Sequence, residues 1–227
     1  MSEFQINFFS QISEIFIDGT FKVAPKNWYQ LLNIFGYDKT HKFFMPLAFI
    51  ILSSKSEEIY NEVFYKIITL VKAHTDLKSF DKVKIMSDFE IGLRNAIKNN
   101  FESCLLDGCY FHYCKAIWKK IKKLNLFKKD LRFNTIIISF IMKSYPFIKE
   151  GKREIYFQKI KSFTNSLGGN YLKLTEYILL NIGKIVNYLI LQILRMKLFK
   201  IEQIIYVKAS TINLTKKFLI ITLNYLF

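Results

Sequence analysis

Cysteine is scarce in this sequence, and its placement excludes a disulfide scaffold. The three cysteines, Cys104, Cys109 and Cys114, are an odd number within one short stretch, whereas disulfide-stapled secreted domains carry an even number. A secretory signal is also lacking, because Glu3 precedes the first apolar run. We therefore expect the protein in a reducing compartment.

No apolar stretch is clean enough to predict a membrane span. The best candidate, 177–194, is interrupted by Asn181, Lys184, Asn187 and Gln192. A charged side chain at the centre of a membrane helix costs about 3 kcal/mol even on lenient scales. We therefore expect no membrane-spanning segment. Basic amphipathic helices also favour binding to a membrane surface. A membrane-surface protein is therefore one of the functional interpretations that the sequence leaves open.

Acidic residues are few in the second half of the chain. Residues 1–110 contain 12 Lys and Arg against 13 Asp and Glu, whereas residues 111–227 contain 22 against 5, so nearly all of the net charge of +16 is C-terminal. This excess favours a polyanionic partner, because cations that neutralise phosphates release counterions. A biased nucleotide composition is the alternative, because the abundant Phe, Ile, Lys, Asn and Tyr have AT-rich codons.

Apolar residues are plentiful, at 51% of the chain, which is enough to bury a core and excludes a disordered tail. Short β-branched and aromatic runs at 14–18, 29–37 and 43–52 predict three strands of an antiparallel meander. Asp18-Gly19 predicts a bulge or tight turn in the first of them. A capping-box pattern from Ser54 to Glu57, followed by apolar residues at helical spacing, predicts a helix over 57–72.

Strands and helices then alternate along the chain. The pattern predicts a strand at 83–86, a helix at 89–99, a strand at 104–110 and a basic amphipathic helix at 113–126. The order βββαβαβα predicts an α/β fold with a mixed sheet and resembles the organisation of RNase H-like nucleases and integrases. We expect a core domain over 1–126 and a divergent, mainly helical, basic region over 127–227.

Two aspartates end neighbouring strands of the expected sheet, Asp18 after the first and Asp88 after the fourth. Carboxylate oxygens are the hard ligands that Mg²⁺ and Mn²⁺ prefer. Two such charges at close range repel, so a cation between them would stabilise the pair. The alternative is that each aspartate is an ordinary turn residue at a strand end.

Several motifs occur in one order over residues 14–126. They are Ile17-Asp18-Gly19-Thr20-Phe21, Gln30-Leu31, Ser87-Asp88-Phe89-Glu90 and Cys109-Tyr-Phe-His112. Together they resemble the transposase domain of Mutator-like elements. The resemblance implies DNA transposition by metal-dependent phosphodiester cleavage and strand transfer, with Asp18 and Asp88 as the first two of three acids that bind Mg²⁺ or Mn²⁺. It also implies a nuclear location, transposon-end DNA as the partner and no small-molecule substrate, and it leaves an oligomer open.

The third acid of that family is not identifiable, because its tryptophan and Thr-Asn-Asn-x-x-Glu pattern does not occur. Glu176 is the nearest candidate by position among the downstream glutamates. A frameshift near 165–180 is one hypothesis for the loss, because Met196-Lys197 in another frame encodes Glu. The chain also shows no DNA-reading module before residue 14, so we expect a fragment of a transposase. The alternative is a catalytically dead remnant that still binds DNA.

Three further groups are candidates for function. Cys109 and His112 have the spacing of half a zinc site, but two more ligands are needed, so we favour a structural pair over bound zinc. Glu90 is either an alternative metal ligand or a surface residue that favours the start of a helix. The basic helix offers lysines to DNA phosphates, and these are Lys115, Lys119, Lys120, Lys122 and Lys123.

Overall fold

The computed structural model describes residues 1–20, 23–76, 80, 82–128, 132–181 and 220–221. The chain divides into two compact units. Unit 1 comprises Met1–Asp107 with the two-residue strand β6 (Ile220–Ile221), and unit 2 begins at Gly108, with Asn181 as its last described residue before a gap.

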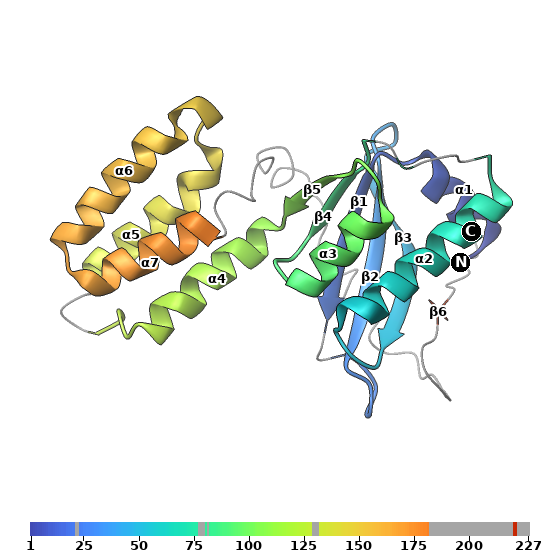
Figure 1. The fold of residues 1–227 in the computed structure, drawn as a ribbon, viewed down its shortest axis with the longest axis horizontal. Helices are drawn as coiled ribbons and strands as arrows, with labels where there is room; N and C mark the ends of the chain where they lie inside the picture. Colours follow the sequence, from blue (N-terminus) through green and yellow to red (C-terminus); the bar gives the residue numbers. More distant parts are fainter. Residues whose placement is uncertain (21–22, 77–79, 81, 129–131, 182–219, 222–227) are drawn as a thin grey trace. The chain divides into compact units, whose positions relative to one another are not determined.

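Unit 1 is built on a mixed sheet (Figure 1). Its principal strands are β1 (Glu14–Thr20), β2 (Gln30–Asp38), β3 (Phe43–Leu52), β4 (Lys84–Ser87) and β5 (Leu105–Gly108). The strand order is β5-β4-β1-β2-β3-β6. β1 pairs with β2, and β2 pairs with β3, in antiparallel orientation. β1 and β4 pair in parallel. A mixed sheet combined with helices confirms the predicted α/β class.

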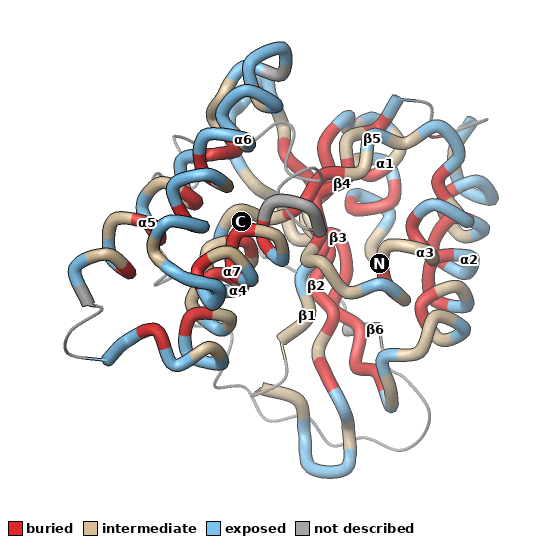
Figure 2. Tube along the Cα trace, turned by 60° about the vertical axis from the view of Figure 1, so that its left-hand side comes forward, coloured by how far each residue is buried: buried red, intermediate tan, exposed pale blue. Residues whose placement is uncertain are grey.

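The helices of unit 1 are α1 (Glu3–Gln11), α2 (Glu57–His74) and α3 (Ile91–Asn100). α2 and α3 lie on the same face of the sheet (Figure 1). The core joins inward strand residues such as Ile15 and Leu32 to a stripe on α2 at helical spacing. That stripe consists of Tyr60, Val63, Phe64, Ile67, Ile68 and Val71. The buried residues therefore follow the strands and the inward sides of the helices (Figure 2).

Three local predictions need correction. β1 does not bend at Asp18-Gly19, because its pairing with β2 is continuous through Thr20, and the register shift lies instead between Ile34 and Phe35. The N-cap of α2 is Ser56, whose hydroxyl accepts from the backbone N–H of Ile59 at 3.4 Å, and not Ser54. α1 was not predicted, although Ser2 and Gln5 form a capping box at its start.

Unit 2 consists of helices in its described part. These are α4 (Tyr110–Lys123), α5 (Arg132–Ser144), the short 3₁₀ helix η2 (Tyr145–Phe147), α6 (Glu150–Ser166) and α7 (Gly169–Asn181). α4, which the sequence assigns to the first domain, packs against α5 and α7. The buried Tyr113 hydroxyl donates to the carbonyl of Met142 at 2.6 Å and joins α4 to α5.

Among the described residues, no helix is long and apolar enough to cross a membrane. The remainder of the apolar stretch 177–194 lies outside the described residues, as does most of the segment to which the frameshift hypothesis applies.

Candidate active site

The pairing of β1 with β4 brings the two predicted aspartates to the same end of neighbouring strands. The last pair of this parallel ladder is Phe16 with Met86, and Asp18 and Asp88 each lie two residues farther along. Asp18 lies within β1 and Asp88 directly follows β4, so both come from the same end of two neighbouring strands. Asp18 is exposed and Asp88 is half-buried, so both are accessible from solvent.

The neighbouring strand β2 contributes polar groups beside Asp18. Asn33 is the residue directly opposite Asp18 in the antiparallel ladder, and opposite residues share one face of a sheet. The Asn33 amide is buried and donates to the Thr20 hydroxyl at 3.3 Å. The face around Asp18 is therefore polar although the strands themselves are largely apolar.

Asp88 lies in the turn that connects β4 to α3. Its carboxylate Oδ1 accepts from the backbone N–H of Glu90 at 2.9 Å, the local bond by which aspartate stabilises a turn. Glu90 is the N-cap residue of α3. α3 is held against α2, because a Cβ at Gly92 would lie 3.3 Å from the backbone nitrogen of Glu57, and Asn95 donates to the Glu57 carboxylate at 2.8 Å.

The side chain of Glu90 contacts α2 and is half-buried. The Tyr60 hydroxyl donates to Glu90 Oε1 at 3.0 Å. Burial raises the pKa of Glu90, and the nearby Asp88 charge raises it further, whereas the Tyr60 bond and Lys55 oppose the rise. Burial also raises the pKa of Tyr60, so the hydroxyl stays protonated and donates. Glu90 is therefore more than a surface residue at a helix start.

Arg94 of α3 ties the end of β4 to β5. Its guanidinium donates to the Ser87 hydroxyl at 3.4 Å and to the carbonyls of Asp107 at 3.1 Å and Leu106 at 3.4 Å. Asp107 is only 9% exposed, and burial raises its pKa to about 6 against the opposing charges of Lys84 and Arg94. Ser87, the residue before Asp88, thus contacts a half-buried guanidinium.

Sequence reasoning missed Tyr60, Arg94 and Asp107. Tyr60 had a visible signal, because it begins the helical stripe that continues at Val63 and Phe64. Nothing local marks Arg94 or Asp107, whose roles depend on contacts between a helix and two strands.

The two aspartates fit a divalent cation as partial ligands. Among the described residues, no group of three or more His, Cys, Asp or Glu side chains could hold a metal ion. Mg²⁺ commonly keeps several waters and binds through one or two carboxylates plus substrate phosphates. Binding of a divalent cation by Asp18 and Asp88 stays a prediction.

Glu176, the candidate third acid, lies on α7 in unit 2. Its carboxylate pairs with Lys161 of α6 at 3.7 Å, and both side chains are more than two-fifths exposed. Its role as a metal ligand stays a prediction.

Cys109 and His112 lie at the start of α4, Cys109 as its N-cap and His112 in its first turn. Both are half-buried. Within the described part of the chain, no third ligand of the metal-binding types joins them.

The predicted DNA-binding lysines divide into two kinds. Lys115, Lys119, Lys122 and Lys123 are exposed along α4, whereas Lys120 is half-buried with its ammonium 4.2 Å from the ring centre of Tyr177. The exposed lysines are available to a polyanion, and Lys120 contributes a cation–π contact within unit 2.

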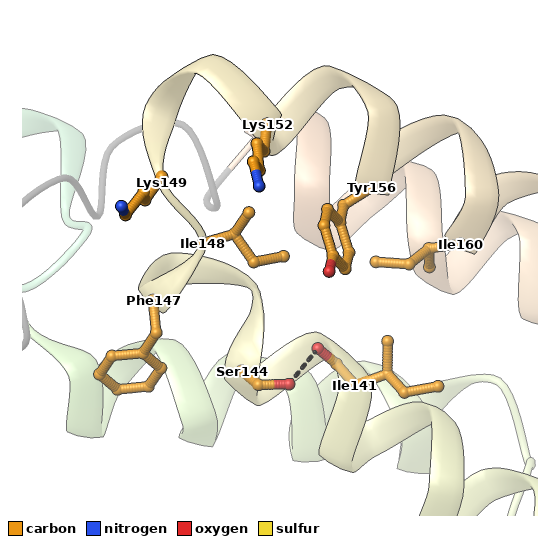
Figure 3. A pocket seen from close by; sticks show the side chains of 8 residues that line it. All are labelled: Ile141, Ser144, Phe147, Ile148, Lys149, Lys152, Tyr156 and Ile160. Atoms are coloured by element: carbon orange, nitrogen blue, oxygen red, sulfur yellow. Dashed lines mark hydrogen bonds between the residues drawn. The ribbon is translucent and has the colours of Figure 1, made fainter.

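A pocket of about 510 Å³ lies between α5, η2 and α6 of unit 2. Figure 3 shows Ile141 and Ser144 on one side and Tyr156 and Ile160 on the other. Lysines line its rim, but no carboxylate or imidazole does. The pocket therefore lacks the groups that the predicted chemistry requires.

Residues 14–116 match the family model of the MULE transposase domain. No curated protein matches the chain in sequence.

Proposed function

We propose that the protein is transposase-derived and cleaves and joins DNA phosphodiesters at transposon ends, because residues 14–116 match the family model of the MULE transposase domain. The observation that supports the proposal is the parallel pairing of β1 with β4, because Asp18 lies in β1 and Asp88 directly follows β4. The family suggests dependence on a divalent metal, and we propose Mg²⁺ or Mn²⁺ as the ion.

An RNase H-like topology is part of the proposal. The strand order β5-β4-β1-β2-β3, with an antiparallel meander followed by a parallel β1–β4 pair, supports it. In such an arrangement the first and fourth strands are neighbours in the middle of the sheet, so their ends offer two carboxylates to one substrate.

Each of the candidate site residues has a proposed role. Asp18 and Asp88 would hold the metal, and Glu176 is the candidate for the third acid. Bound divalent ions supply charge stabilisation for the entering and leaving oxygens of the phosphodiester. The exposed α4 lysines would bind DNA phosphates. DNA as the partner implies a nuclear location, which we propose as well.

Substitution at the two aspartates tests the proposal. The full chain is incubated with a supercoiled plasmid and Mg²⁺ or Mn²⁺, and nicked product is measured. Asp18→Asn and Asp88→Asn should each abolish nicking, because each removes an anionic ligand without changing the side-chain volume. Asp76→Asn, which alters an exposed carboxylate after α2, is the matched control and should nick like the wild type. Nicking that persists in chelator or in both variants would refute the proposal.

A DNA-binding remnant without catalysis is the alternative function. The observation that favours it is the exposed row of α4 lysines in a unit with few acidic residues. It predicts duplex binding that weakens steeply with salt and no nicking under any metal condition. Affinity that does not change with salt would exclude both functions.

A further inference from the structure

A chain of hydrogen bonds connects three elements to the Asp88 turn. The Gln30 amide of β2 donates to the Tyr60 hydroxyl of α2, and that hydroxyl donates to Glu90 Oε1 at 3.0 Å. The backbone N–H of Glu90 then donates to Asp88 Oδ1 at 2.9 Å. Gln30 and Tyr60, far away in the sequence, are thereby connected to the residue whose backbone N–H holds the Asp88 carboxylate.

The same glutamine also supports the Asp18 segment. A Cβ at Gly19, the residue after Asp18, would lie 2.8 Å from Gln30 Oε1, so the amide occupies the space that the missing side chain leaves. Gln30 and Tyr60 are each 1% exposed. Burial on this scale fixes the rotamers of both side chains.

We propose that Gln30 and Tyr60 are positioning residues for Asp18 and Asp88, the two proposed ligands of a divalent cation. The Gln30 amide packs under the backbone beside Asp18 and, through Tyr60 and Glu90, orients the Asp88 carboxylate. The inference rests on the proposed function, because it concerns the same pair of aspartates. Residues that orient metal ligands through hydrogen bonds change metal affinity when they are replaced.

A structural role alone would have a different signature from a positioning role. Tyr60→Phe removes one hydroxyl and leaves a buried amide N–H and a carboxylate oxygen without this partner, so it also lowers stability. Tyr113→Phe is the matched control, because it removes a buried hydroxyl that donates to a carbonyl in unit 2. The double variant Gln30→Met, Tyr60→Phe removes the unpaired amide as well and should recover stability without restoring the bond to Glu90.

The experiment measures Mn²⁺ affinity of the full-length variants by the paramagnetic resonance of free Mn²⁺, alongside thermal unfolding. Tyr60→Phe should weaken Mn²⁺ binding about 10-fold. The Mn²⁺ affinity of Tyr113→Phe should stay within about twofold of that of the wild type. The double variant should be more stable than Tyr60→Phe but should bind Mn²⁺ equally weakly. Wild-type affinity in Tyr60→Phe, or affinity that returns together with stability in the double variant, would overturn the inference alone. A wild type with no Mn²⁺ binding sensitive to Asp88→Asn would overturn the proposed function together with it.

Discussion

Replacement of Asp107 by asparagine should stabilise unit 1 at neutral pH and have less effect in acid. Asp107 is 9% exposed in β5, and burial raises its pKa from an ordinary value of 3.8 to about 6. A carboxyl with a raised pKa binds its proton more tightly in the folded chain than in the unfolded chain, so its ionisation costs stability. Asparagine has nearly the same volume and does not ionise.

The size and sign of the effect follow from the two pKa values. Below pH 3.8 this carboxyl is protonated in both states and contributes no pH dependence. As the pH rises from about 4 to about 6, the folded chain holds more protons than the unfolded chain, and the free energy of unfolding falls. The full loss is about 3 kcal/mol. Between about pH 4.5 and 7.5, the advantage of Asp107→Asn over the wild type should therefore grow by about 2 kcal/mol.

Urea unfolding at several pH values measures this difference. Trp28 reports on unit 1 in a Trp118→Phe background, because the chain has two tryptophans and Trp118 belongs to unit 2. Asp76→Asn, at an exposed carboxylate, controls for the general effect of losing one negative charge. A difference between Asp107→Asn and the wild type that stays constant with pH, or that shrinks as the pH rises, would refute the assignment of a buried, disfavoured charge.

Three other outcomes follow from the structure. Gly19→Ala should lower the free energy of unfolding by about 1–3 kcal/mol, because its Cβ would lie 2.8 Å from a buried amide oxygen. Thermal unfolding checks this change. The control Gly151→Ala, with open space around its Cβ position, should cost no stability. Ser2→Ala should cost about 1 kcal/mol through loss of the α1 cap, and an unchanged melting temperature would contradict this. Lys119→Ala should reduce the salt slope of duplex binding by about 0.9, whereas Lys120→Ala should leave the slope unchanged in the same titration.

The strands and helices of unit 1 could be predicted because their apolar periods are strong. The run at 43–52 gives β3 with the same bounds, and the stripe after Glu57 gives α2 with an end two residues later than predicted. α1 was missed because a nine-residue helix offers few turns of periodicity. Its capping box, Ser2 with Gln5, was the available signal.

Gly19 shows where local reasoning fails. The dipeptide Asp18-Gly19 is a common turn signal, yet β1 passes through it in unbroken register. The glycine is needed for a tertiary reason, since the Gln30 amide occupies the space beside it. No pattern within a few residues of Gly19 contains that information.

The candidate site, like the fold, could be predicted from the sequence only in part. Asp18 and Asp88 could be paired from strand order alone, because the ends of parallel neighbours meet at one edge of a sheet. The contacts that support them could not, since Gln30, Tyr60 and Glu90 are each separated from the next by 30 residues. Such contacts depend on how α2 packs over β2, which periodicity does not specify.

The energetic cost of this network is itself an argument for its role. Gln30 and Tyr60 are buried in a core that otherwise consists mainly of aliphatic and aromatic residues, and apolar side chains of similar size could fill the same volume without needing partners. The hydrogen bonds from Gln30 to Tyr60 and from Tyr60 to Glu90 fix the orientation of these side chains, whereas the buried Gln30 Oε1 has no hydrogen-bond partner among the described residues. In this domain the network ends on Asp88 Oδ1. A buried amide oxygen without a partner costs stability, so the proposed positioning of the two aspartates gives Gln30 and Tyr60 a role that folding alone does not require.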